Sequence, residues 1–218
     1  GSNSIVVTDD GCGMTKEDLV LSVERHATSK LPSDDLLDIT YLGFRGEALA
    51  SIGAVSRLTI SSRKNTLSDS WSLKVEGGKL NSPKPSSLIE GTKVEVLDLF
   101  FSTPARLKFL KSERAEVNRV LDVVKRLAMA NPMIAFTLNN DLKTRFRVAA
   151  HQFDFLDAQI ARLSDIMGKV FTENAVKINV QRGDVRLTGY AGLPTLNKSN
   201  SRYQFFFVNN RPMRDPLL

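Results

Sequence analysis

The sequence predicts a mixed α/β fold arranged as two domains. Strand patterns dominate from Ser56 to Asp98, a long amphipathic helix pattern follows from Ser112, and helix and strand patterns return from about Gln152. With 218 residues, 42% of them hydrophobic, the chain has the length and composition of one or two packed domains. We expect a first domain over residues 1–151 and a second, incomplete one over residues 152–218.

The first 60 residues predict one strand and two helices separated by loops. Residues 5–8 are rich in β-branched side chains and are expected to form a strand. Thr15 begins a capping pattern, and apolar residues at helical spacing predict a helix to about Ala27. Residues 31–41 are expected to form a loop, and residues 47–52 a short helix that starts from a glycine-rich turn.

The middle of the chain alternates as β-strands do and then becomes helical. Pro83 to Ser87 is expected to be a surface loop. From Ser112 the apolar residues form one helical stripe that ends at Asn131-Pro132. Strands are predicted over residues 57–63, 71–76, 92–98, 133–139 and 143–149.

The last part of the chain predicts a helix followed by a hairpin and a final strand. The helix is expected over residues 156–167, and Arg182-Gly183-Asp184 is a hairpin turn between strands 176–181 and 185–190. Tyr203 to Val208 is a further strand, and a turn leads out of it. Because so few residues precede the first strand and the chain stops after a turn, we expect a fragment of a longer protein.

Composition excludes several classes of protein. No apolar run approaches the roughly 20 residues that a membrane-spanning helix needs. Cys12, the single cysteine, excludes an internal disulfide framework and a cysteine-built zinc site, and a reducing compartment fits best. His26 and His151 have no cluster of carboxylates around them in the sequence, which argues against a transition-metal site. The net charge of +6 favours an anionic partner.

Asp9-Asp10-Gly11-Cys12-Gly13 follows the first predicted strand and is the first candidate binding motif. A carboxylate at a strand end can accept a hydrogen bond from an exocyclic amino group such as that of adenine, and it is mispaired against a carbonyl. Gly11 and Gly13 would let backbone and ligand approach closely. The alternative interpretation is a tight turn with a capping aspartate.

Gly43-Phe44-Arg45-Gly46-Glu47-Ala48-Leu49 is the second candidate motif, a glycine loop that leads into a helix. Free N–H groups at a helix start suit phosphate oxygens, although an ordinary turn has the same composition. The motif matches neither the Walker A loop nor the dinucleotide fingerprint. Between the two motifs, Thr28, Ser29 and Lys30 supply hydroxyls and a cation, which suit phosphate or simply end a helix.

These segments, in this order and spacing, resemble the MutL family of DNA mismatch repair ATPases, which belongs to the GHKL class. The resemblance covers nearly the whole chain, and the matching motifs have their bacterial form. The matching segments are residues 9–14, 25–30, 43–52, 91–96, 104–110 and 207–215. It implies a GHKL (Bergerat-type) α/β sandwich that binds ATP, followed by a ribosomal-protein-S5-like α/β transducer domain.

The resemblance also implies roles for individual residues. Asp9 would hold the adenine amino group, with Thr92 nearby through water, and Gly11 and Gly13 would shape the pocket. Thr28, Ser29 and Lys30 would belong to the ATP lid and the phosphate contacts. The phosphates would be wrapped by the backbone of Gly43, Phe44, Arg45, Gly46, Glu47, Ala48 and Leu49.

The resemblance places the catalytic groups outside this chain. In the family a preceding helix carries the Glu that activates water and the Asn that holds Mg²⁺, and a later lysine reaches the γ-phosphate. We therefore expect a parent protein that hydrolyses ATP slowly and a fragment that does not. The alternative is a non-catalytic DNA-binding or interaction module with vestigial nucleotide loops; a protein kinase of the GHKL class lacks support in the sequence.

The resemblance finally implies partners and a location. ATP would pair two N-terminal regions and signal from a MutS-type mismatch sensor to a downstream nuclease and helicase, in the bacterial cytoplasm at the nucleoid. Non-sequence-specific DNA binding is expected, with Arg211 and Arg214 as its candidate contacts. Other basic residues cluster around the long helix, where a solvated helix face explains each of them equally well: Lys108, Lys111, Arg114, Arg119, Lys125 and Arg126.

Overall fold

The computed structural model describes residues 3–29, 42–43, 45–152, 154–196 and 203–214. The chain divides into two compact units, Gly1–Glu116 and Val117–Leu218. The loop expected at residues 31–41 and two predicted site residues, Lys30 and Phe44, lie outside the described residues.

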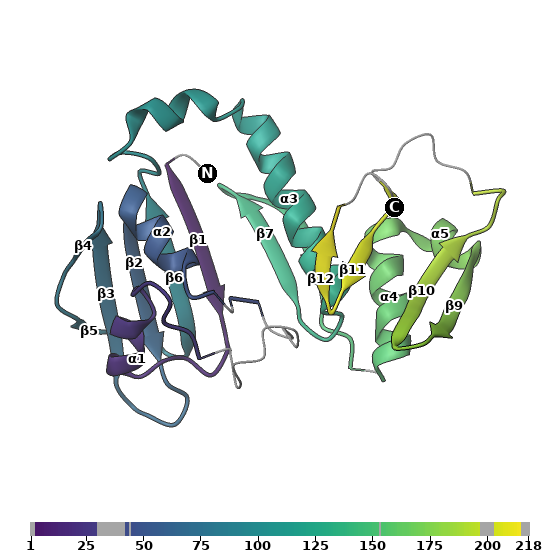
Figure 1. Cartoon of the computed structure of the whole chain (residues 1–218), viewed down its shortest axis with the longest axis horizontal. Helices are drawn as coiled ribbons and strands as arrows, with labels where there is room; N and C mark the ends of the chain where they lie inside the picture. The colour runs from purple at the N-terminus through teal and green to yellow at the C-terminus, as the bar shows by residue number, and fades with distance from the viewer. Residues whose placement is uncertain (1–2, 30–41, 44, 153, 197–202, 215–218) are drawn as a thin grey trace. The chain divides into compact units, whose positions relative to one another are not determined.

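The first unit is built on an antiparallel sheet with the strand order β1-β6-β2-β3-β4, and β5 pairs with β3 (Figure 1). The sheet places the N-terminal strand β1 at one edge, next to β6. Its strands are β1 (Ser4–Asp9), β2 (Arg57–Arg63), β3 (Ser70–Glu76), β4 (Lys79–Leu80), β5 (Lys84–Ser86) and β6 (Gly91–Leu97).

Two helices, α1 (Lys16–Leu21) and α2 (Ala48–Val55), cover one face of this sheet (Figure 1). Alternate residues of the strands point to that face, as the period of two requires. Leu19 of α1 is fully buried there, and Leu49 and Ile52 of α2 pack against the same core. The strands contribute Leu58, Ile60, Leu73, Val75 and Val96. Burial of this apolar face fixes which side chains point toward the helices.

Helix α1 is shorter than its sequence pattern predicts. The predicted cap is correct, because the Thr15 hydroxyl accepts the Asp18 N–H at 3.1 Å. The helix ends at Leu21 and not near Ala27, since His26 has φ of 65°, outside the helical region. The His26 N–H donates instead to the Gly46 carbonyl oxygen at 3.1 Å. Turns at Val23 and Glu24, whose N–H groups bond the carbonyl oxygens of Val20 and Leu21, and then this tertiary contact replace the rest of the predicted helix.

Two further differences from prediction occur in the first unit. The segment expected as a loop at 83–87 contains β5, in which Pro85 pairs opposite Trp71 of β3. Proline is tolerated there because β5 is an edge strand. The 3₁₀ helix η1 (Pro104–Phe109) follows β6 and was not predicted. None of its residues is buried, and Phe109 is 82% exposed, so η1 has no apolar face that a periodic pattern could reveal.

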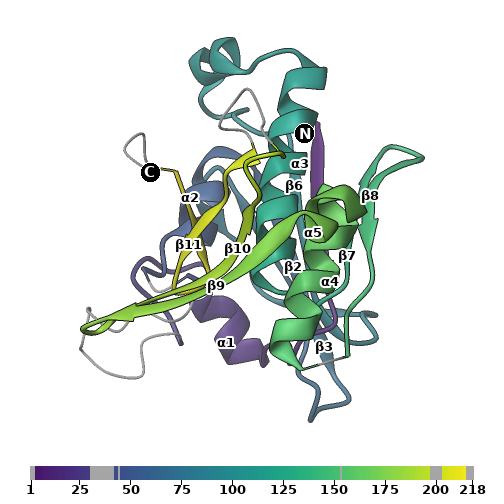
Figure 2. The ribbon, with the colours of Figure 1, turned by 90° about the vertical axis from the view of Figure 1, so that its right-hand side faces the viewer.

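Helix α3 (Glu113–Ala130) has the predicted extent and ends just before Asn131-Pro132. The second unit continues with the hairpin β7 (Phe136–Asn140) and β8 (Lys143–Val148), then α4 (Phe155–Met167) and the unpredicted short helix α5 (Lys169–Glu173). Figure 2 shows β9 (Ala175–Arg182) and β10 (Val185–Gly192) as one long twisted hairpin. Its predicted turn is correct, with Gly183 at φ of 58°.

The final hairpin joins β11 (Phe206–Val208) to β12 (Arg211–Met213). Its two turn residues, Asn209 and Asn210, both have positive φ, at 47° and 62°. This is the geometry of a type I′ turn, for which asparagine is well suited. The predicted turn is therefore correct, and strand β12 follows it.

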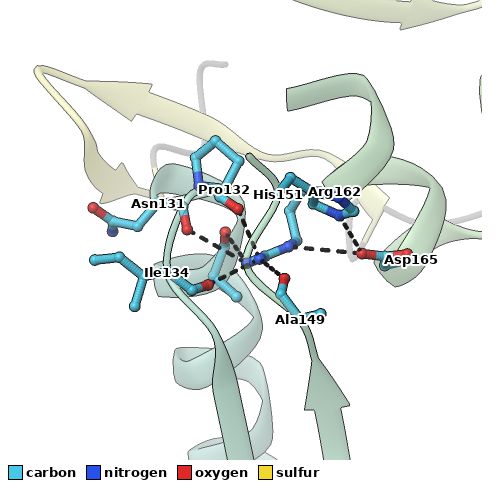
Figure 3. Close-up of polar contacts among 8 residues, drawn as sticks. Asn131, Pro132, Ile134, Ala149, His151, Arg162 and Asp165 are labelled. Carbon is cyan, nitrogen blue, oxygen red and sulfur yellow. Dashed lines mark hydrogen bonds and ion pairs between the residues drawn. The ribbon is translucent and has the colours of Figure 1, made fainter. Parts of the chain in front are cut away.

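Arg162 of α4 is the central polar contact of the second unit (Figure 3). Its side chain is fully buried, and its two terminal nitrogens donate to backbone carbonyl oxygens at 2.6 to 3.4 Å. The acceptors are Ala128, Asn131, Pro132, Ile134 and Ala149. Desolvation lowers the pKa of the guanidinium, and the Asp165 carboxylate opposes that change.

This contact bears on the expected boundary at residues 151/152. Packing divides the chain earlier, between Glu116 and Val117 inside α3. The reason is that Arg162 ties the end of α3 and the flanks of the β7–β8 hairpin to α4. A compact unit need not coincide with a domain shared by homologous proteins, so the domain boundary at 151/152 stays a prediction.

Candidate functional site

One row of side chains crosses the sheet of the first unit at the level where β1 ends. The antiparallel registers place Asp9 of β1 opposite Thr92 of β6, Thr92 opposite Ser62 of β2, and Ser62 opposite Trp71 of β3. Directly opposed residues project from the same face of a sheet. The row shares its face with Ile60 and Leu58, so it lies on the side of the sheet that α1 and α2 cover.

A buried hydroxyl holds the centre of this row. Ser62 is fully buried, and its Oγ accepts the Met14 N–H at 2.9 Å. The same oxygen lies 3.1 Å from the Gly91 carbonyl oxygen and 2.9 Å from Thr92 Oγ1. One serine thus joins the loop after β1 to the start of β6.

Asp9 itself is exposed at the end of β1, and one of its oxygens is committed locally. Oδ1 accepts the Gly11 N–H at 3.0 Å, which is the capped turn that the sequence allowed as an alternative. Oδ2 has no hydrogen-bond partner among the described residues. The carboxylate therefore both shapes the turn and retains an oxygen that can accept from a ligand.

Two glycines let the Asp9 loop lie against the sheet. Gly13 has φ of 63°, and a Cβ built there would stand 1.8 Å from the Arg63 carbonyl oxygen. Gly91 has φ of 68°, and its Cβ would stand 1.9 Å from the Asp9 carbonyl oxygen. Both clashes are with backbone, which cannot swing away. These glycines set how closely the loop, β1 and β6 approach one another.

Substituting Gly13 tests this close approach. Gly13→Ala is expected to lower the free energy of unfolding by more than about 2 kcal/mol, since the left-handed backbone alone costs roughly 1–2 kcal/mol and the clash adds to it. Gly43→Ala is the matched control, because Gly43 also has positive φ, 85°, and a Cβ there meets nothing within 4 Å. Urea denaturation of the two variants measures the difference; equal destabilisation would contradict the close approach.

A second set of contacts joins the segment after α1 to the glycine loop before α2. The Thr28 hydroxyl donates to the Gly43 carbonyl oxygen at 3.1 Å, and the His26 N–H donates to Gly46. His26 Nδ1 lies 3.6 Å from Glu47 Oε1, with both side chains largely exposed. Two of the sequence motifs are therefore neighbours in space.

Helix α2 starts from this loop. The first N–H groups of a helix have no acceptor one turn earlier within the helix, and the Glu47 side chain makes no capping hydrogen bond among the described residues. Leu49 contributes its backbone only, because its side chain packs into the core. Ser29, Arg45 and Ala48 are exposed.

The predicted site residues thus form two sets within the first unit. The strand-end set contains Asp9, Gly11, Gly13 and Thr92, and the loop set contains Thr28, Gly43, Gly46 and Glu47. Sequence reasoning missed Ser62 and Gly91, which connect the first set. A signal existed for Ser62, because it follows Leu58 and Ile60 in the buried phase of β2, where an apolar residue is expected.

The basic residues proposed for DNA differ in their surroundings. Arg214 is 71% exposed and forms an ion pair with Asp122 of α3, and Arg211 is half-buried on β12. Arg126, one of the helix candidates, is buried, bonds Asp122 at 3.1 Å and lies over the Phe205 ring. Lys108, Lys111 and Arg114 are exposed and have no ion pair among the described residues, and the same holds for Arg106, which was not among the predicted contacts.

The described part of the chain offers neither a metal-binding cluster nor a membrane span. It holds no group of three or more His, Cys, Asp or Glu side chains that could bind a metal ion. None of its helices is both long and apolar enough to cross a membrane. We assign no residue of this chain to Mg²⁺.

Curated relatives share the whole of this chain at high identity. It is 54% identical over all 218 residues to the DNA mismatch repair protein MutL of Rhodospirillum rubrum and 50% identical to that of Paramagnetospirillum magneticum. The chain belongs to the MutL family. It spans 35% and 36% of the length of these two relatives.

Structural comparison agrees with this membership. The MutL ATPase domain of Aquifex aeolicus, solved with ADP, matches 99% of this chain with a TM-score of 0.74 and 25% identity, and the chain covers 72% of it. The model of the DNA mismatch repair protein C-terminal domain matches residues 163–218. The expected GHKL-type α/β fold with a transducer-type second part is confirmed for this member of the MutL family.

Proposed function

We propose that this chain binds ATP and that the longer protein that contains it is a mismatch repair ATPase. The observation that carries the proposal is the opposition of Asp9 and Thr92 on β1 and β6, with the loop after Asp9 packed onto the sheet through Gly13. The ADP in the Aquifex aeolicus MutL structure supports nucleotide as the ligand class.

The chemistry of the strand-end set suits adenine. The free oxygen of Asp9 can accept a hydrogen from the adenine amino group, and Thr92 lies next to it for a bridging water. At the same position guanine presents a carbonyl oxygen, which an aspartate would repel. Gly11 and Gly13 keep the loop close to the sheet, so the base can reach the Asp9 carboxylate.

The chemistry of the loop set suits phosphates. The N–H groups at the start of α2 provide donors and the positive end of a helix dipole. The Thr28 hydroxyl bonds the loop at Gly43, so a phosphate bound to the loop would lie close to Thr28 and Ser29. We propose that Thr28 and Ser29 belong to the ATP lid. Lys30 and Phe44 belong to this proposal by resemblance only.

Nucleotide-dependent melting of the full-length protein tests ATP binding. A non-hydrolysable ATP analogue at about 100 times its dissociation constant is expected to stabilise the folded state by roughly 2.7 kcal/mol. A non-catalytic module with vestigial loops would show no shift with the same analogue.

We further propose that the 218 residues alone do not turn over ATP. The family resemblance assigns the general base, the Mg²⁺ ligand and the γ-phosphate lysine to none of these residues.

DNA binding is the second part of the proposal. Arg106 and Lys108 of η1, with Lys111 and Arg114 after it, form an exposed group of cations, here called the η1 cations. Because no carboxylate pairs with them among the described residues, they can meet backbone phosphates without breaking an existing ion pair. Arg214 would first have to leave Asp122, and Arg211 is half-buried, so we expect both to contribute less.

Charge reversal on η1 tests these cations. Lys108→Glu with Lys111→Glu is expected to lower the salt dependence of DNA affinity by about one unit of slope for each phosphate that is no longer neutralised. Lys79→Glu with Lys84→Glu is the control, because both lysines are exposed, on β4 and β5, and the double change alters the net charge equally. Fluorescence anisotropy with labelled duplex DNA at several salt concentrations gives the slopes. Equal effects of the two double variants would show that only net charge matters.

The remaining family functions complete the proposal. ATP binding would pair two copies of the N-terminal region and transmit the signal of a MutS-type mismatch sensor to a nuclease and a helicase, in the cytoplasm at the nucleoid. The support is membership of the MutL family, whose curated relatives are named as DNA mismatch repair proteins.

A further inference from the structure

Ser62 lies within the row that contains the proposed adenine-binding residues, yet it sits one strand further into the sheet than Thr92. Its hydrogen bonds decide how the Thr92 hydroxyl can be used. A role for Ser62 in ligand selection rests on the proposed function, because it concerns the base that the Asp9 and Thr92 positions select.

Ser62 has one hydrogen to donate and two lone pairs with which to accept. The Gly91 carbonyl oxygen, 3.1 Å away, is an acceptor only, so this contact is a hydrogen bond only when Ser62 donates to it. The Met14 N–H donates to Ser62 from the other side. The remaining contact, 2.9 Å to Thr92 Oγ1, then requires that Thr92 donates to Ser62.

This arrangement satisfies the buried serine completely and removes the donor function of Thr92. The Thr92 hydrogen points to Ser62, and its lone pairs remain for a ligand or a bridging water. Asp9, directly opposite Thr92, also offers an acceptor. Two adjacent acceptors favour a group with hydrogens to give, such as the adenine amino group, and disfavour the carbonyl oxygen of guanine.

We propose that Ser62 is a positioning residue that fixes the Thr92 hydroxyl as an acceptor and thereby contributes to the preference for adenine over guanine nucleotides. Without the serine hydroxyl, Thr92 regains a free hydrogen. That hydrogen can be donated to a guanine carbonyl, directly or through water, so discrimination falls although no residue that faces the base has changed.

The test is the ratio of affinities for non-hydrolysable ATP and GTP analogues, measured by calorimetry on the full-length protein. Ser62→Ala is expected to lower the ATP to GTP ratio about fivefold, the equivalent of one reoriented hydrogen bond. Ser62→Thr keeps a hydroxyl and is expected to retain the ratio. Ser61→Ala is the matched control, because Ser61 is the next residue of β2 and bonds Ser72 on the opposite face.

A double variant separates positioning from general damage. In a Thr92→Val background, which has no hydroxyl to orient, Ser62→Ala is expected to change the ratio no further. An unchanged ratio in Ser62→Ala, or an equal fall in the Thr92→Val background, would overturn the inference. If Ser62→Ala does not fold, Thr92→Val alone must lower the ratio, and failure to do so also overturns it. Absence of nucleotide binding in the unmodified protein would instead reject the proposed function.

Discussion

Asp9→Asn is expected to weaken binding of the ATP analogue by about 100-fold while leaving the protein folded. The asparagine oxygen can still accept the Gly11 N–H, as Asp9 Oδ1 does at 3.0 Å, so the turn is retained. The side-chain NH₂ group then replaces the free carboxylate oxygen. It is a donor that faces the amino group of adenine, which is also a donor.

Asp10→Asn is the matched control for this prediction. Asp10 is exposed, carries the same charge and follows β1, and its side chain makes no hydrogen bond or ion pair among the described residues. Its affinity for the analogue is expected to stay within about twofold of the unmodified protein, since a solvated charge contributes little. Calorimetric titration of both variants gives the comparison. Similar weakening in the two variants would show that charge, and not the position of Asp9, governs binding.

Arg162→Lys is expected to lower the free energy of unfolding by about 3–5 kcal/mol, the usual cost of breaking a buried charged network. Lysine keeps the charge but has a single nitrogen with three hydrogens. It cannot reach the five carbonyl oxygens that the planar guanidinium bonds, and the carbonyls left without a donor remain buried.

Arg186→Lys controls for the substitution itself. Arg186 lies on β10 in the same unit, is exposed and bonds Asn179 at 3.0 Å. Its replacement is expected to change stability by less than about 0.5 kcal/mol. Chemical denaturation, followed by circular dichroism, measures both variants. A destabilisation at Arg162 no greater than that at Arg186 would mean that water replaces the guanidinium without cost.

Periodic elements of this fold could be predicted, and elements set by tertiary contacts could not. The apolar stripe of α3 and the alternation of β2 define those elements within a residue or two. Helix α1 was predicted too long because nothing local in the sequence reports that His26 bonds Gly46. Strand β5 was predicted as a loop because Pro83 and Pro85 are typical of loops, and the edge pairing of Pro85 with β3 leaves no signal in the sequence.

The candidate site shows the same division. Asp9 and Thr92 are separated widely in sequence, and their opposition follows from the resemblance or from the sheet register, not from spacing. Arg162 attracted no notice in the sequence, since charged residues are seldom fully buried and one arginine in an amphipathic helix is usually solvated. Its acceptors are backbone carbonyls, which no side-chain pattern can reveal.

The Arg162 network also orders the events of synthesis. Its acceptor carbonyls precede it in the chain by 13 to 34 residues, so all of them are made first. Until α4 leaves the ribosome, the end of α3 and the flanks of the β7–β8 hairpin have no guanidinium to bond. We therefore expect the second unit to complete its folding only after α4 has emerged, and a nascent chain that stalls before residue 162 to expose an unfinished surface to chaperones and proteases.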